Sequence, residues 1–241
     1  MKFLAIIFIS FMMTVTAAKS QNLVTITNAG HNGDNTVELL ARVDKDVISK
    51  KPELVVLMVG TNDMLNLRNM LTVADYTKHY QELITKIKKE SKLMLMTIPP
   101  INVEYLNERV DPTKYASGGG PQALVDSANA AIKELAKKNK CRLIDLNKIL
   151  LACGGSTKDK ESIFQNVPNF GINDGVHPTA IGYKIIGTAV YQAIINTEPK
   201  VSSIVCFGDS ITFGYKMTGQ GTIKGDSYPA VLNRMLNQIA Q

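Results

Sequence analysis

Short apolar runs alternate along this chain with longer segments in which apolar residues recur at helical spacing. The runs predict β-strands at residues 23–27, 54–59, 93–98, 142–146 and 204–207. The run at 54–59 is apolar at every position, which is typical of a strand buried on both faces of a parallel sheet.

Helices are predicted at about residues 37–51, 72–89, 121–140, 178–196 and 228–238. Thr72 and Asp75 have the spacing of a capping box at the start of the second helix. Pro178 is expected in the first turn of the fourth, where proline is well tolerated. Residues 101–120 and roughly 152–171 are predicted to be irregular.

Strands that alternate with helices predict an α/β fold, in which a parallel sheet carries helices on both faces. The chain has 241 residues, 45% hydrophobic and 20% charged, which suits a single domain over residues 22–241. In open parallel sheets, the chemistry lies at the carboxyl ends of the strands. Candidate catalytic residues are therefore expected just after the strands.

The chain opens with Met1 and Lys2, an apolar run from Phe3 to about Val15, and small residues up to Ala18. This order predicts a signal peptide over residues 1–18, and hence a secreted or periplasmic protein. The run is shorter than the roughly 20 residues that a spanning helix needs, so stable membrane insertion is not expected.

Charge and cysteines exclude some classes of function. The formal net charge is +6, but the basic residues are dispersed, so a nucleic-acid partner is not expected. The three cysteines are Cys141, Cys153 and Cys206, and none has the spacing of metal ligands. Cys206 is interpreted as a core residue, while a disulfide between Cys141 and Cys153 stays open.

Ser210 follows the last apolar run directly, in the sequence Gly208-Asp209-Ser210. A serine is a weak nucleophile until a base accepts its proton. Asp174 and His177 are separated by two residues before a predicted helix, so the carboxylate can reach Nδ1 and hold Nε2 towards a serine.

Donors for a tetrahedral intermediate follow the first two strands. Gly33 allows the backbone to come close, Asn62 offers an amide donor, and the N–H of Ser210 would be a third donor. Taken singly, Gly33 and Asn62 are more often turn residues. Asp63 and Asp209 are expected to brace their loops rather than to titrate in catalysis.

Four segments together resemble the blocks of the SGNH (GDSL-type) hydrolase family: residues 208–210, 28–34, 60–63 and 174–178. The resemblance implies a three-layer α/β/α sandwich with a parallel, flavodoxin-like sheet and no metal or other cofactor. It also implies a role for each residue: Ser210 as nucleophile, His177 as base, Asp174 as its orienting group, and Gly33 and Asn62 as oxyanion donors.

The order of the blocks departs from the family, in which the serine block comes first. Here it comes last, and reading residues 201–241 before residues 22–196 restores the usual order. The chain is therefore predicted to be circularly permuted. Triads tolerate different chain orders because only their geometry matters.

The resemblance and the export signal predict a secreted serine esterase that acts on short-chain esters, acetyl above all, of a carbohydrate or small molecule. Two alternatives stay open. The first is a lipase, lysophospholipase or thioesterase that acts on longer acyl chains. The second is a catalytically inactive module that binds glycans in the same cleft. Tyr105, Tyr115 and Phe164, in polar loops, favour a sugar site, and an inactive module predicts the loss of a site residue, which is not seen.

Overall fold

The computed structural model describes residues 23–238, so the predicted signal peptide lies outside the described residues. Within them, the five predicted strands form one sheet in the order β1-β5-β2-β3-β4, and every neighbouring pair is parallel. The strands are β1 (Thr25–Gly30), β2 (Leu54–Met58), β3 (Lys92–Met96), β4 (Arg142–Ile144) and β5 (Ser203–Gly208).

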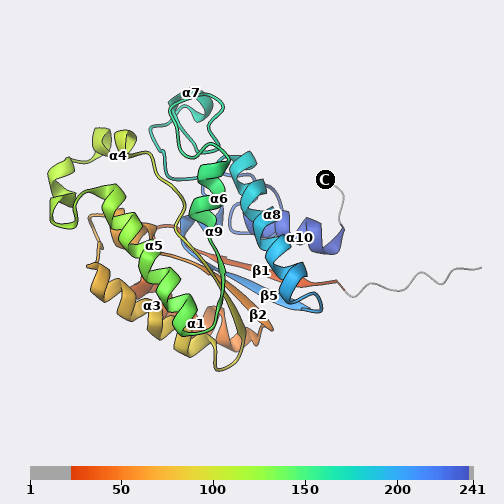
Figure 1. Cartoon of the computed structure of the whole chain (residues 1–241). Helices are drawn as coiled ribbons and strands as arrows, with labels where there is room; N and C mark the ends of the chain where they lie inside the picture. Colours follow the sequence, from red (N-terminus) through yellow and green to blue (C-terminus); the bar gives the residue numbers. More distant parts are fainter. Residues whose placement is uncertain (1–22, 239–241) are drawn as a thin grey trace, which may run out of the picture.

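Helices cover both faces of this sheet (Figure 1). One layer consists of α1 (Thr36–Asp46), α3 (Val73–Ile87) and α5 (Pro121–Lys138). The other consists of α6 (Leu146–Ala152), α8 (Ala180–Thr197) and α10 (Tyr228–Asn237). The predicted three-layer α/β/α sandwich is therefore confirmed. Of the helices between residues 23 and 238, none combines the length and the apolar character that crossing a membrane requires.

Strand β2 shows how the sheet is held between the two layers, because all of its residues are buried. Val55 and Leu57 pack into the core on the side of α1, α3 and α5. Leu54, Val56 and Met58 pack into the core on the other side. Successive side chains of a strand point to opposite faces, so a strand covered twice must be apolar throughout.

Strand β5 lies inside the sheet, between β1 and β2, although it is the last strand of the described chain. Counted from β5, the strand order becomes 2-1-3-4-5, which is the order of flavodoxin-like sheets. The start of β1 lies beside the end of α10. There Asn237 Oδ1 accepts the backbone N–H of Val24 at 2.7 Å, and Nδ2 donates to the carbonyl oxygen of Val24 at 3.0 Å.

Helix α8 begins later than the sequence predicts. Thr179 is its N-cap and accepts the backbone N–H of Gly182. The placement of Pro178 in the first turn is therefore wrong. Pro178 instead pairs with Phe164 in an isolated antiparallel bridge, which holds it outside the helix.

The two segments predicted to be irregular contain short helices. Residues 101–120 include α4 (Val103–Arg109) and the 3₁₀ helix η2 (Pro112–Gly118), and residues 152–171 include α7 (Val167–Phe170). Their N-caps are Asn102, Asp111 and Asn166. Because Asn and Asp favour turns as well as N-caps, the sequence pattern indicated loops.

All three cysteines are free, so Cys141 and Cys153 do not form the disulfide that the sequence left open. Cys206 is buried in β5, in agreement with its interpretation as a core residue. Burial raises the pKa of its thiol to about 12.

Candidate active site

Ser210 lies at the carboxyl end of β5, in the interior of the sheet. It begins α9 (Ser210–Phe213), and the N-cap Asp209 accepts the backbone N–H of Ile211 at 2.9 Å. A Cβ at Gly208 would lie 2.2 Å from the carbonyl oxygen of Met58 in β2. Only glycine fits at this position, where β5 ends and the chain turns towards α9.

Three side chains form a chain of hydrogen bonds at this edge of the sheet. His177 Nε2 lies 2.9 Å from Ser210 Oγ, and His177 Nδ1 lies 2.9 Å from Asp174 Oδ2. Such an imidazole can accept the hydroxyl proton at Nε2 while Nδ1–H stays bonded to the carboxylate. The structure thus brings together the residues predicted as nucleophile, base and orienting group.

Asp174 is held by the backbone as well as by the imidazole. Its Oδ1 accepts the N–H groups of Val176 at 2.8 Å and His177 at 2.7 Å. Burial alone would raise the pKa of Asp174, but the hydrogen bonds and the charge of His177 outweigh it and lower the pKa below its ordinary value. Asp174 is therefore a carboxylate, the form that stabilises a protonated imidazole.

Two residues outside the predicted motifs support the His177 loop. Gln165 is fully buried and donates through Nε2 to the carbonyl oxygens of Pro178 (3.0 Å) and Tyr215 (3.1 Å). Its backbone N–H donates to the His177 carbonyl oxygen at 2.8 Å. The ring centroids of Tyr215 and His177 lie 4.5 Å apart. No motif marks Gln165 or Tyr215, because their contacts arise only in the folded chain.

The predicted oxyanion donors Gly33 and Asn62 lie in the segments that follow β1 and β2. Gly33 precedes α1 and has a φ of +82°, a conformation that favours glycine. Asn62 lies in α2 (Thr61–Leu65), and its Nδ2 donates to the carbonyl oxygen of Asp34 at 2.8 Å. A primary amide has two N–H donors, so the second one of Asn62 is left for a ligand.

The other two histidines of the described chain lie outside this set of contacts. His31 has a side chain that is 55% exposed, and its Nδ1 lies 3.7 Å from Asp34 Oδ2. His79 lies in α3, with Nδ1 3.5 Å from the hydroxyl of Thr36. Of the three, only His177 contacts Ser210.

Two further carboxyl groups are buried, those of Asp63 and Asp209, which adjoin Asn62 and Ser210 in the sequence. Burial raises the pKa of Asp63 to about 6 and that of Asp209 to about 7, although hydrogen bonds oppose the shift. Asp63 Oδ1 accepts the backbone N–H of Thr36 at 3.0 Å and also its hydroxyl, whereas Asp209 caps α9. Both carboxyl groups brace the start of a helix beside the site.

A pocket of about 240 Å³ opens beside Asn62 and His177. Its exposed lining is mostly apolar and comes from Leu65, Leu106, Val110, Tyr115 and Val176, while Thr61, Asn66 and Arg109 add polar groups. Of the three aromatic residues expected to favour a sugar site, only Tyr115 lines this pocket. Tyr105 and Phe164 are buried elsewhere, so they do not support that expectation.

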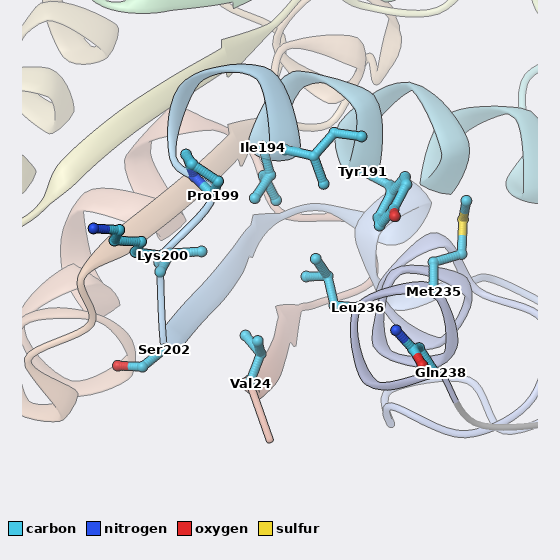
Figure 2. Close-up of a pocket in the computed structure, with 11 residues that line it drawn as sticks. Val24, Tyr191, Ile194, Pro199, Lys200, Ser202, Met235, Leu236 and Gln238 are labelled. Carbon is cyan, nitrogen blue, oxygen red and sulfur yellow. The ribbon is translucent and has the colours of Figure 1, made fainter. Parts of the chain in front are cut away.

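A larger cavity, of about 390 Å³, lies at the opposite end of the sheet (Figure 2). This cavity lies where β1 and β5 begin and where α8 and α10 end. Its lining includes Val24, Ser202 and Leu236. None of the predicted site residues lines it. The site chemistry therefore belongs to the smaller pocket at the carboxyl ends of the strands.

The chain is similar to known hydrolases in sequence and in structure. The sequence model of the GDSL-like Lipase/Acylhydrolase family matches residues 10–185. An acetylxylan esterase of Geobacillus stearothermophilus is 23% identical over 176 residues, which are 71% of this chain and 72% of that enzyme.

Two solved structures are similar over a comparable length. An acetyl xylan esterase is 28% identical, with a TM-score of 0.55, and the match covers 69% of this chain and 79% of that one. A lipase/acylhydrolase from Enterococcus faecalis is 25% identical, with a TM-score of 0.54, and the match covers 68% and 72%.

Proposed function

Because the chain belongs to the GDSL-like lipase/acylhydrolase family, we propose that it removes short acyl groups, acetyl above all, from carbohydrate esters. The family and the acetylxylan esterase relatives make the protein a carboxylic ester hydrolase. The observation that carries the proposed mechanism is the 2.9 Å contact between Ser210 Oγ and His177 Nε2. The acetyl group and the carbohydrate are supported by the acetylxylan esterases, and export stays a prediction from residues 1–18.

In the proposed reaction, Ser210 Oγ attacks the carbonyl carbon of the ester while His177 Nε2 takes the hydroxyl proton. The carbonyl oxygen becomes an oxyanion, which accepts hydrogen bonds from the N–H groups of Gly33 and Ser210 and from Asn62 Nδ2. Asp174 stabilises the imidazolium through Nδ1. His177 then gives its proton to the departing alcohol oxygen as the C–O bond breaks, which leaves an acyl group on Ser210.

Water completes the cycle by the same steps in reverse. His177 takes a proton from the water, whose oxygen attacks the acyl carbon, and returns this proton to Ser210 Oγ as the carboxylic acid leaves. The reaction is thus an acyl transfer to water through a covalent intermediate. Every proton moves through the imidazole of His177. Nε2 must therefore face Ser210 Oγ while Nδ1 stays bonded to Asp174.

The apolar pocket supports a second candidate, hydrolysis of longer acyl esters. Leu65, Leu106 and Val110 offer a wall that an alkyl chain could contact beside Asn62. In this alternative, the same Ser210 and His177 would act on a lipid or a thioester. Only the acyl group would differ, so a series of acyl lengths separates the two candidates.

We expect p-nitrophenyl acetate to be hydrolysed with a kcat/KM at least about tenfold above that for the octanoate ester. The direction of this preference rests on the acetylxylan esterase relatives. Its size follows because one methylene in a fitted pocket changes selectivity by roughly 10- to 200-fold, and octanoate has about six more than acetate. The measurement is the initial rate across acetate, butyrate and octanoate esters. A preference for octanoate would keep the mechanism and contradict the acetyl assignment.

We also propose that the chain is circularly permuted relative to its family. Three observations support this. The match to the family model ends at residue 185, before Gly208-Asp209-Ser210. Counted from β5, the strand order is that of a flavodoxin-like sheet. Asn237 binds the backbone of Val24, so the end of α10 and the start of β1 lie side by side.

A rearranged chain tests the permutation. Residues 201–241, joined by a short Gly-Ser linker to residues 22–196, should fold and hydrolyse p-nitrophenyl acetate with a kcat within about threefold of the parent, because triads depend on geometry rather than chain order. A second rearrangement, with its new ends inside β2, is the control and should not fold. A folded but inactive first rearrangement would contradict the proposal.

A further inference from the structure

Arg42 of α1 lies at the carboxyl ends of β1 and β5, and its charged side chain is only 12% exposed. Its Nε donates to Asp34 Oδ2 at 2.6 Å, and Nη1 donates to Asp46 Oδ2 at 2.8 Å. Nη1 also donates to the carbonyl oxygen of Ala29 at 3.0 Å, and Nη2 to that of Gly208 at 2.8 Å. A single guanidinium therefore joins the end of β1, the end of β5 and the loop between β1 and α1.

Two of these acceptors, Asp34 and Gly208, belong to the segments that carry the proposed oxyanion donors. Asp34 directly follows Gly33. The carbonyl oxygen of Asp34 also accepts Asn62 Nδ2 at 2.8 Å, which ties the second donor to the same loop. Gly208 lies two residues before Ser210, whose N–H is the third donor.

The arrangement depends on the shape of an arginine. The guanidinium presents donors in a rigid planar fork, and this fork lies over the Phe207 ring, with Cζ 4.6 Å from the ring centroid. A lysine would offer a single ammonium in place of the fork, so it could not bond Asp34, Asp46 and Gly208 in the same way. Asp34 and Asp46 balance the charge of Arg42, which makes its burial tolerable.

We propose that Arg42 is a positioning residue that holds the oxyanion hole in shape, a role that rests on the ester-hydrolase mechanism proposed above. The oxyanion exists only in the transition state and the tetrahedral intermediate, so misplaced donors weaken transition-state binding and leave substrate binding largely unchanged. The effect of changing Arg42 therefore falls on kcat rather than on KM.

The test compares Arg42→Lys with two carboxylate variants of the same ion-pair cluster. Asp34→Asn weakens the link from Arg42 to the oxyanion loop, whereas Asp46→Asn weakens only an ion pair between two residues of α1. For p-nitrophenyl acetate, we expect Arg42→Lys and Asp34→Asn to lower kcat by about 10- to 100-fold with KM within about twofold. This is less than the 10²- to 10³-fold cost of removing an oxyanion donor itself. Asp46→Asn should stay within about threefold of the parent.

The affinity for a tetrahedral inhibitor is a second measurement, and a change in stability alone does not alter it in the folded protein. Phenylboronic acid, which forms a tetrahedral adduct with an active serine, should bind Arg42→Lys about tenfold or more weakly, while KM does not change. Arg234→Lys is the matched control, because Arg234 also donates to a backbone carbonyl oxygen, that of Gly225, but belongs to α10. It should keep the kcat and the boronate affinity of the parent.

The role of Arg42 is wrong if Arg42→Lys and Asp34→Asn keep the kcat and the boronate affinity of the parent. It is equally wrong if Asp46→Asn loses as much kcat as Asp34→Asn. If Arg42→Lys does not fold, the comparison of Asp34→Asn with Asp46→Asn decides. A parent protein without esterase activity would instead contradict the proposed function, so the two failures are distinguishable.

Discussion

Replacing Ser210 with alanine should lower kcat for p-nitrophenyl acetate by at least about a thousandfold, with little change in thermal stability. The substitution removes only the hydroxyl group. Its Oγ lies 2.9 Å from His177 Nε2 and is the atom that would form the bond to the acyl carbon. Ser210 is nearly buried at the start of α9, and alanine fits that position without loss of the helix. The measurement is steady-state hydrolysis beside a melting curve.

Ser91→Ala is the control for this change. Ser91 is partly buried, and its hydroxyl donates to the Pro52 carbonyl oxygen at 2.7 Å, just before β3 begins. The control loses one serine hydroxyl bond at the other end of the sheet, so kcat should not change. If a folded Ser210→Ala protein kept the activity of the parent, Ser210 would not be the nucleophile, and the permuted order of the blocks would lose its main support.

Much of the fold follows from short-range patterns, because a buried parallel strand and an amphipathic helix each repeat within a few residues. β2 was predicted from six consecutive apolar residues, 54–59, and α3 begins at the predicted N-cap, Thr72. The placement of Pro178 failed for a long-range reason. Its bridge to Phe164 holds it outside the helix, and no local pattern carries that contact.

The candidate site divides in the same way. Asp174, His177 and Ser210 are marked by their residue types and by their places after strands or before a helix. Arg42 shows no such mark, because its position in α1 looks like the polar face of an ordinary amphipathic helix. Its importance comes from acceptors on β1 and β5, and Gly208 is 166 residues away along the chain. Residues that support a site through such contacts become visible only in the folded structure.

Replacing Asp174 with asparagine should lower kcat by about 10³- to 10⁴-fold while the fold is retained. The two backbone N–H groups of Val176 and His177 both donate to Asp174 Oδ1. An asparagine must keep its oxygen there, so its NH₂ group takes the place of Oδ2, which at 2.9 Å is closer to His177 Nδ1 than Oδ1 is at 3.1 Å. Nδ1 then becomes an acceptor and the ring proton moves to Nε2, which can no longer accept the proton of Ser210.

The expected loss of kcat comes from the wrong tautomer of His177. A general loss of stability would not produce this effect in a folded protein. Asp159→Asn is the control, because Asp159 is an exposed carboxylate of a nearby loop, and it should keep the kcat of the parent. Asp174→Asn should also react slowly with an organophosphate that labels Ser210, since that reaction needs the same proton acceptor. Rapid labelling together with the kcat of the parent would show that Asp174 does not orient His177, and the base would have to be held by another group.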